Sequence, residues 1–197
     1  MNNYETIQIT DFDDTLFPTS WIKNNNIDII KMYNDPYFKN LDLLLSKFLN
    51  EKNIYIVTNA SEFWILQCLD ILPLTKKSID NNNVIIVSAR DLYENTHNIN
   101  SWKINAFKKI MDNHINNNNF NIVSYGDANY EYMGLLNLDD YLKSKNKNYL
   151  LKNVKFIDYP NSEELIAQLH TLNNIRDKII NDKNYVDINF NVNKKID

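Results

Sequence analysis

Short apolar runs alternate along the chain with longer segments of helical periodicity. Five runs have the length and the β-branched character of buried strands, and they cover residues 4–10, 53–58, 83–88, 120–125 and 153–157. Nearly continuous apolar strands are typical of a parallel sheet that helices cover on both faces. The pattern therefore predicts an α/β fold, with a Rossmann-like parallel sheet of five strands and helices on both of its faces.

The segments between these runs carry the apolar spacing of helices. One or two helices are expected within residues 21–50, interrupted near Pro36 because proline lacks the N–H group that a helix interior needs. A further helix begins after Ser61 and runs to about Leu72, with Pro73 just beyond it. The remaining helices are expected over 101–115, 130–142 and 162–180.

The 197 residues contain no internal repeat and no linker rich in proline, glycine or serine. We therefore expect one domain over residues 1–182. Residues 183–197 form a C-terminal extension. The alternation of Val186, Ile188 and Phe190 in it suits an edge strand, with disorder as the alternative.

Composition and charge narrow the function classes. The formal charge is −4, so the chain lacks the broad basic field of a nonspecific nucleic-acid binder, although a local patch is compatible with it. No run of about 18 apolar residues predicts a membrane span. The one cysteine, Cys68, lies in an apolar helical stretch where we expect it in the core, and it cannot form an internal disulfide. These features and the absence of a signal-like start make the cytoplasm the expected compartment.

Polar residues follow the predicted strands at the point where each one ends. Residues 11–16 follow the first strand, Thr58 and Asn59 end the second, residues 88–91 end the third, and Gly126-Asp127 ends the fourth. In an open α/β sheet, ligands bind beyond the carboxyl ends of the strands. The sequence therefore predicts a site of carboxylates and hydroxyls at one edge of the sheet.

Two features raise this pattern above chance. An Asp-x-Asp pair alone is weak evidence in a chain rich in aspartate, but here Thr15 follows Asp13 by two residues and an apolar strand precedes Asp11. The chain has only 2 glycines, and one of them, Gly126, stands directly before Asp127 at a strand exit. A glycine retained in so glycine-poor a sequence indicates a backbone requirement.

These residues resemble the haloacid dehalogenase superfamily, specifically its aspartyl phosphatases. Asp11, Asp13 and Thr15 match the family's first motif, Asp-x-Asp-x-Thr after a strand, and Thr58 matches the second, a Thr or Ser that ends the next core strand. The resemblance covers roughly residues 4–160, with its motifs in the family's order.

The third and fourth motifs follow further along the chain. Lys103, at the start of a helix, fits the third motif, although Lys108, Lys109 and Arg90 are competing cations. Gly126-Asp127 fits the fourth motif. Glu131 takes the place of the motif's later acid, where Asp is commoner, and a solvated helix face is the alternative for it.

The resemblance implies a phosphatase that hydrolyses phosphate monoesters through an aspartyl-phosphate. Asp11 is the implied nucleophile. Asp13 then protonates the leaving oxygen and later deprotonates the attacking water. Thr58 donates to a phosphoryl oxygen, and Lys103 offsets the charge of the nucleophile and the phosphoryl group. As a simpler alternative, Asp13 and Asp14 cap the following turn, and Thr58 caps a helix.

The implied cofactor is Mg²⁺, a hard cation that suits carboxylate oxygens. We expect Asp11, the backbone carbonyl of Asp13 and Asp127 to bind it, with Glu131 helping directly or through water. Three further residues are expected to contact the substrate, namely Thr15, Asn59 and Arg90.

The two gaps in which the family carries substrate-selecting caps are short here, so no large cap domain is expected. Phe17, Pro18 and Trp21 are the expected local lid. An uncapped site suits a bulky substrate such as a phosphorylated macromolecule. Closure of the site by a second subunit is the alternative. The alternatives are a phosphotransferase of the same superfamily, a phospho-receiver domain and a non-catalytic binding protein. A receiver domain would need a phosphorylated aspartate at the end of a middle strand, where the sequence offers no strong candidate.

Overall fold

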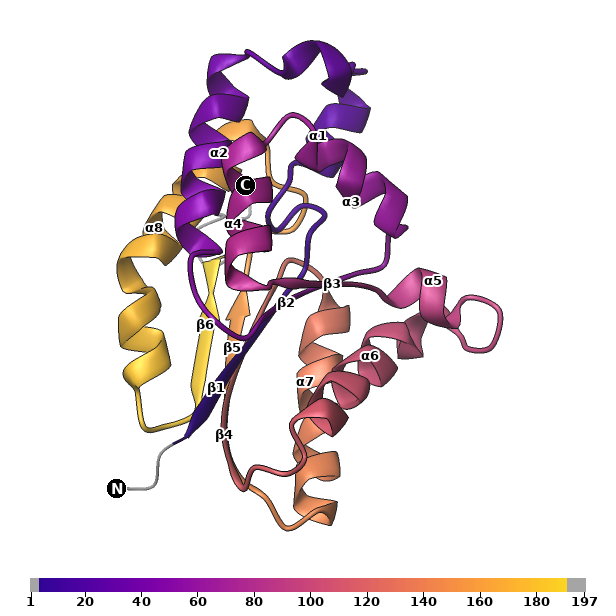
Figure 1. Cartoon of the computed structure of the whole chain (residues 1–197), viewed down its shortest axis with the longest axis vertical. Coiled ribbons are helices and arrows are strands. Elements are labelled where there is room, and N and C mark those ends of the chain that lie inside the picture. Colours follow the sequence, from indigo (N-terminus) through magenta and orange to yellow (C-terminus); the bar gives the residue numbers. More distant parts are fainter. Residues whose placement is uncertain (1–3, 191–197) are drawn as a thin grey trace, which may run out of the picture.

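The computed structural model describes residues 4–190 and folds them around one open sheet (Figure 1). All its strands are parallel, in the order β3-β2-β1-β4-β5-β6. They are β1 (Glu5–Thr10), β2 (Ile54–Thr58), β3 (Ile85–Ser88), β4 (Asn119–Gly126), β5 (Asn148–Lys155) and β6 (Val186–Asn189). The predicted α/β class and parallel sheet are confirmed, and a sixth strand extends the expected five.

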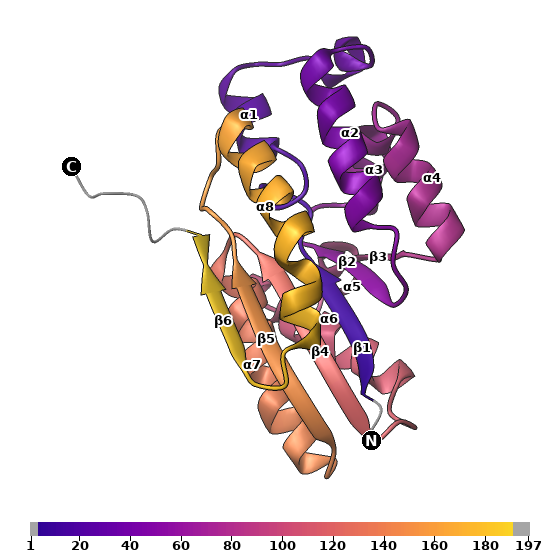
Figure 2. The same ribbon diagram turned by 90° about the vertical axis from the view of Figure 1, so that its left-hand side faces the viewer.

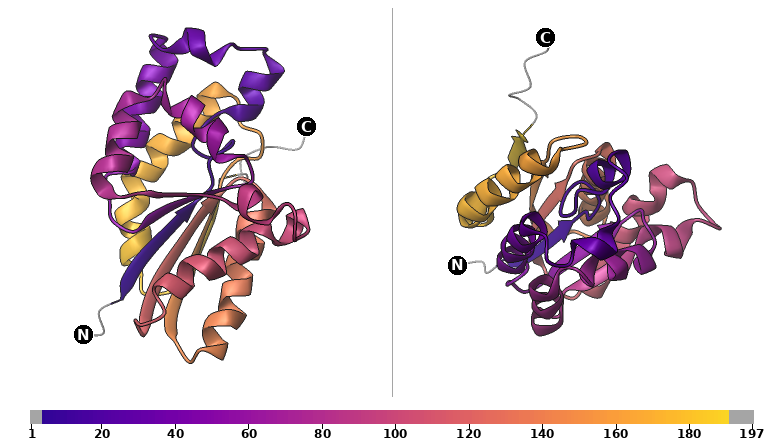
Figure 3. Two further views of the ribbon diagram at one scale, coloured as in Figure 1. Left: turned by 45° about the vertical axis from the view of Figure 1, so that its right-hand side comes forward. Right: turned by 90° about the horizontal axis from the view of Figure 1, so that it is seen from above.

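Helices cover both faces of the sheet, as the apolar strands require (Figures 2 and 3). One face packs against α2 (Pro36–Phe48), α3 (Glu62–Leu69), α4 (Pro73–Asn82) and α8 (Ser162–Asn181). The other packs against α5 (Ala89–Tyr93), α6 (Ile99–Asn113) and α7 (Asn129–Ser144). Cys68 lies in the first of these two apolar layers and is fully buried, as expected.

The order of the strands creates a switch point between β1 and β4. The chain runs outward from β1 through β2 to β3, then crosses to β4 on the other side of β1 and continues outward to β6. Thr10 at the end of β1 pairs with Tyr125 near the end of β4, and the backbone N–H of Asp11 donates to the Tyr125 carbonyl at 2.9 Å. Residues that follow these two strands are therefore neighbours in the crevice where such sheets bind ligands.

Two helices between Thr58 and Lys103 were not expected. Pro73 begins α4 instead of following the end of α3, because the first turn of a helix tolerates proline. The cap comes from another helix: the Asp42 carboxylate of α2 accepts from the N–H groups of Leu74 at 3.0 Å and Thr75 at 2.7 Å. The short α5 is capped by the hydroxyl of Ser88, which accepts from the Asp91 N–H at 2.9 Å.

The fifth strand differs from the expectation, whereas the sixth is the edge strand that the alternating tail suited. β5 begins at Asn148 and ends at Lys155, where the sequence predicted 153–157. The alternating tail forms β6, which pairs in parallel with β5 at the edge of the sheet. Residues 191–197 of the predicted extension lie outside the described residues.

The segment after β1 forms small helices instead of a cap domain. It contains α1 (Thr19–Asn24), the 3₁₀ turn η1 (Ile29–Met32) and then α2. Within residues 4–190, no helix combines the length and the apolar character that crossing a bilayer needs.

Candidate functional site

Three carboxylates meet at the switch point. Asp11 follows β1, Asp127 follows β4, and Glu131 lies in the first turn of α7. One oxygen from each lies within 4.8 Å of the others, and the three residues are 6%, 8% and 2% exposed. Oxygen donors of this kind fit a hard divalent cation, so the cluster passes a first test as a metal site.

Lys103 of α6 inserts its ammonium group into this cluster. Its Nζ lies 2.7 Å from Asp11 Oδ1 and also forms an ion pair with Glu131, and the residue is 2% exposed. Lys103 is thus the candidate cation that reaches Asp11. Arg90, a competitor for that role, is half exposed and pairs with Glu94 at 2.9 Å.

Burial and mutual repulsion shift the titration of the cluster. Burial raises the pKa of Asp11 well above its usual range, Lys103 opposes this, and Glu131 and Asp127 add to it. Burial and then Glu131 raise the pKa of Asp127 to about 7. Burial by itself would lower the pKa of Lys103, but the adjacent Asp11 and Glu131 raise it, so the ammonium stays charged. Three carboxylates therefore face one lysine, an imbalance that a divalent cation would correct.

Thr15 holds Asp127 in place. Its hydroxyl donates to Asp127 Oδ1 at 3.2 Å and accepts from the Asp127 N–H at 3.1 Å. Thr15 is fully buried, so the structure assigns its hydroxyl to the carboxylate and not to the expected contact with a substrate.

The backbone requirement at Gly126 comes from Glu131. A Cβ atom at Gly126 would lie 2.2 Å from Glu131 Cγ and 2.5 Å from its carboxylate carbon. Glu131 occupies this space because its Oε2 accepts from the N–H of Ala128 at 3.1 Å, at the start of α7. Glycine is therefore needed for Glu131 to approach the strand exit, and its backbone needs no unusual dihedral angle there.

Asp13 lies on the other side of the site, toward β2. In a continuing strand, Asp11 and Asp13 would point to the same side. Strand β1 ends at Thr10, before both residues, so this expectation does not apply. Three donors fix its carboxylate: Thr19 Oγ1 at 2.5 Å and Trp64 Nε1 at 2.9 Å on Oδ1, and Thr58 Oγ1 at 3.0 Å on Oδ2. The carboxylate of Asp13 is near enough to Asp11 to raise the pKa of Asp11.

Sequence reasoning missed Thr19 and Trp64 in this arrangement. Ser61 at the cap of α3 predicts that helix, and Trp64 follows in its first turn, but nothing in the sequence indicates where the indole points. The Trp64 ring packs edge-on against Phe17 with centroids 6.2 Å apart, which directs its N–H to Asp13.

Of the other residues predicted for the site, Thr58 and Asn59 lie at the end of β2, and Arg90 lies away from the cluster. Thr58 donates its hydroxyl proton to Asp13 and accepts from the Ala60 N–H at 2.9 Å, so it faces the site with its proton already engaged. The amide oxygen of Asn59 is buried and has no hydrogen-bond partner in the described part of the chain. The structure does not bring Arg90 to the cluster: its Nε binds Glu94.

Asp14 and Phe17 are structural residues. Asp14 accepts from the N–H of Ser20 at 2.8 Å and from its hydroxyl at 2.5 Å, which caps α1 from the preceding loop, and its φ of 56° lies in the left-handed region. Capping, the alternative considered for Asp13 and Asp14, thus applies to Asp14. Phe17 is fully buried and stacks on Phe12 with centroids 5.6 Å apart, so the expectation that it belongs to a lid is wrong.

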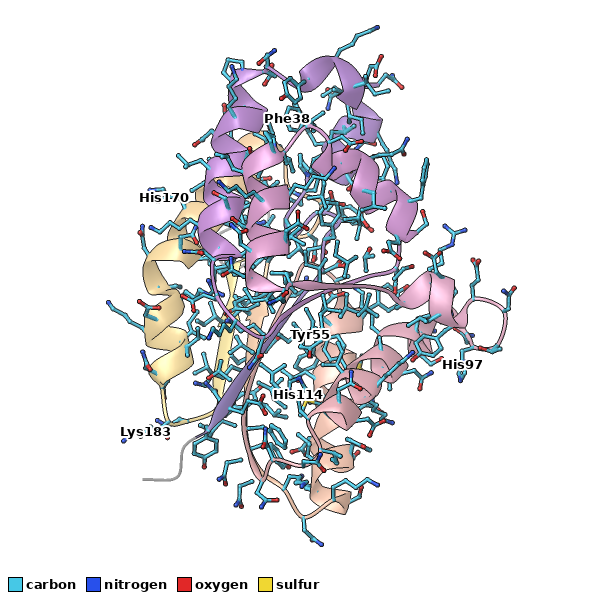
Figure 4. The ribbon with its side chains drawn as sticks, in the orientation of Figure 1. Phe38, Tyr55, His97, His114, His170 and Lys183 are labelled. Carbon is cyan, nitrogen blue, oxygen red and sulfur yellow. The ribbon has the colours of Figure 1, made fainter. Side chains whose placement is uncertain are left out.

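The three histidines lie on separate parts of the molecule (Figure 4). His97 and His170 are exposed. His114 bonds to Tyr55 at 2.7 Å and to Glu5 at 2.9 Å, and Glu5 is the first residue of β1, at the opposite end of that strand from Asp11.

The fold and the site together define an open parallel α/β protein with a buried Asp-Asp-Glu cluster that can hold a metal ion. Comparison with protein-family models, with curated proteins and with solved structures finds no match.

Proposed function

We propose that this chain is a Mg²⁺-dependent phosphatase of the haloacid dehalogenase type, which hydrolyses phosphate monoesters through an aspartyl-phosphate. The observation that carries the proposal is the contact of Lys103 with Asp11 inside the cluster that Asp127 and Glu131 complete. A nucleophilic carboxylate, a fixed cation and further oxygen ligands then stand together where α/β sheets bind ligands.

The electrostatics fit the demands of phosphoryl transfer. Hydrolysis of a phosphate monoester is so slow in water that a catalyst must supply about 20 kcal/mol or more, mainly by positioning and charge neutralisation. Asp11 and an incoming phosphate dianion repel each other, and Lys103, buried beside Asp11, offsets that repulsion at the reacting oxygen. Asn59 follows the neighbouring strand β2, and its buried amide oxygen has no hydrogen-bond partner among the described residues, so this amide can contact a substrate.

Bound Mg²⁺ would neutralise charge on the phosphoryl oxygens and orient them. Asp11 and Asp127 are the side chains proposed to bind it, together with the backbone carbonyl of Asp13. Both oxygens of Glu131 are already engaged, one with Lys103 and the other with the Ala128 N–H. Glu131 would therefore act on a bound ion mainly by holding Lys103, with any contribution to the ion made through water.

The reaction proceeds in two steps. A carboxylate oxygen of Asp11 attacks phosphorus, the bond to the leaving oxygen breaks, and Asp13 supplies the proton that this oxygen takes up. Asp13 then accepts a proton from the water that attacks the aspartyl-phosphate, which releases inorganic phosphate and restores Asp11. Thr58, Thr19 and Trp64 hold the Asp13 carboxylate toward the substrate during both steps.

The test is hydrolysis of p-nitrophenyl phosphate by the purified chain with MgCl₂ and with EDTA. We expect Mg²⁺-dependent turnover, a loss of at least about 10³-fold in Asp11→Asn, and no change in Asp140→Asn. Asp140 is an exposed residue of α7, so its variant makes the same chemical change outside the site. Activity that survives in Asp11→Asn refutes the assignment.

Product analysis separates the alternatives. Release of inorganic phosphate in proportion to p-nitrophenol supports hydrolysis. Transfer of the phosphoryl group to an added alcohol in preference to water indicates a phosphotransferase. A phosphorylated Asp11 that persists without turnover indicates a receiver domain. A phosphorylated substrate is the only partner that the proposal requires, and a cytoplasmic location remains a prediction.

A further inference from the structure

A cavity lies between α3 and the segment that contains α1 and η1. Its volume is about 840 Å³, within the range of small-molecule sites. Seven of its twelve lining residues are apolar or aromatic: five isoleucines, Tyr33 and Trp64. Ile30 is 78% and Tyr33 53% exposed, so the cavity leaves large apolar side chains in contact with water.

Trp64 connects this cavity to the proposed catalytic site. Its ring lines the cavity while its Nε1 donates to Asp13 Oδ1 at 2.9 Å. The ring is also packed edge-on against Phe17, so it forms a fixed wall. The cavity therefore begins one side chain away from the carboxylate that serves the leaving oxygen.

We propose that this cavity binds the leaving group of the substrate, and that this group is large and predominantly apolar. The proposal rests on the function proposed above. A leaving oxygen that receives its proton from Asp13 carries its organic group past Asp13, and Trp64 is the wall it meets there. The isoleucines then remove that group from water.

The charges at the cavity argue for the same class of substrate. Three charged residues line it, Lys23, Asp28 and Asp70. The two aspartates pair with lysines outside the lining, Lys31 at 3.3 Å and Lys76 at 3.0 Å, so the lining itself offers one lysine and no cluster of positive charge for a second phosphate or a polyanion. A small, hydroxyl-rich alcohol would leave the isoleucine walls uncovered. An apolar alcohol of aromatic size covers them and gains the transfer free energy of its buried surface.

The experiment compares kcat/KM for 1-naphthyl phosphate and 2-glycerol phosphate. We expect the ratio to favour 1-naphthyl phosphate by about 100-fold, equivalent to about 3 kcal/mol at 1.4 kcal/mol for each tenfold change. In Gln67→Trp, a new ring fills the cavity from α3, and the ratio falls at least tenfold. Leu66→Trp is the matched control because Leu66 is the adjacent, 45% exposed residue of α3 that does not line the cavity, and the ratio is retained there.

Binding of 1-naphthol, which has no phosphate, to the Asp11→Asn chain by calorimetry separates the two proposals. Suppose that the wild-type chain hydrolyses neither ester, that the Asp11→Asn chain binds 1-naphthol, and that adding Gln67→Trp to it abolishes this binding. That result refutes the phosphatase and keeps the cavity as a site for apolar groups. Turnover of both esters with a ratio near one, or a ratio unchanged by Gln67→Trp, overturns the cavity proposal alone. Preference for a nucleotide or a phosphopeptide over 1-naphthyl phosphate overturns it as well. Absence of both turnover and binding overturns both proposals.

Discussion

The ionised Asp127 carboxylate lowers the free energy of unfolding, so replacing Asp127 with asparagine should make the metal-free protein more stable. Burial and the nearby Glu131 raise its pKa from an ordinary value of 3.8 to about 7. At about 1.4 kcal/mol for each pH unit, keeping the carboxylate ionised in the folded protein costs on the order of 4 kcal/mol above pH 7. Asparagine carries no charge and retains the oxygen that accepts from Thr15.

The sign of the pH dependence follows from the raised pKa. The folded protein binds the Asp127 proton more tightly than the unfolded chain does, so the cost is absent below about pH 4. It grows as the pH rises from 4 to 7, and is constant above that. Asp127→Asn should therefore match the wild type near pH 4 and exceed its stability near pH 8. For a domain of this size, about 1 kcal/mol of stability shifts the melting temperature by 2–4 °C. A gain of about 2 kcal/mol, half of the full ionisation cost, therefore raises the melting temperature by about 4–8 °C.

The assay is thermal unfolding followed by circular dichroism, in EDTA and in millimolar MgCl₂, at both pH values. At pH 8, Mg²⁺ should raise the melting temperature of the wild type and leave that of Asp127→Asn unchanged. The difference in melting temperature between the two proteins should therefore be smaller with Mg²⁺ than in EDTA. Asp140→Asn, with its exposed carboxylate, should show no such rise. An Asp127→Asn protein that is no more stable than the wild type at pH 8 in EDTA refutes the reasoning.

Three further substitutions test the neighbours of the cluster. Thr15→Val removes both hydrogen bonds to Asp127 and should weaken Mg²⁺ binding about 10- to 100-fold in calorimetry. Gly126→Ala places a Cβ atom against Glu131, and we expect urea unfolding to show a loss of about 1–3 kcal/mol in the free energy of unfolding. Lys103→Met leaves buried carboxylates without their cation and should cost about 3–5 kcal/mol in the same urea experiment at pH 8 without metal.

Each of these variants has a control in the chain. Thr171→Val changes a threonine of α8 whose hydroxyl bonds only to its own helix, and Mg²⁺ affinity should not change. A Cβ atom at Gly134 would have the Phe107 ring as its nearest neighbour, at 3.0 Å, so Gly134→Ala should cost less than Gly126→Ala. Lys143→Met removes an exposed ion pair with Asp139 and should cost under about 1 kcal/mol. Equal losses in a variant and its control would contradict the role assigned to that residue.

Much of the fold follows from local sequence pattern. Short runs rich in β-branched and aromatic residues locate β1 to β4 within a few residues, because such side chains suit a pleated, largely buried surface. Strand exits are then marked by the change from apolar to polar residues. Asp11, Thr58 and Asp127 could therefore be assigned to one edge of the sheet before any coordinates were known.

The sequence could not decide the structure of elements that depend on a partner far along the chain. The helix α4 has no capping residue of its own before Pro73, and Asp42 of α2 supplies the cap across 32 and 33 residues. For β6 the sequence left an edge strand and disorder as alternatives, and the strand forms because β5 offers an unpaired edge.

At the candidate site, the sequence by itself determined which residue types stand at the strand exits, since a parallel sheet brings those exits together whatever the helices do. Only the tertiary structure decided which partner each side chain takes: Lys103 with Asp11, Thr15 with Asp127, and Trp64 with Asp13. Two of these partners come from helices, α6 and α3, whose rotation over the sheet is set by packing of their apolar faces, and Thr15 belongs to a buried loop. Packing of that kind depends on the whole core, and no local pattern of residues encodes it.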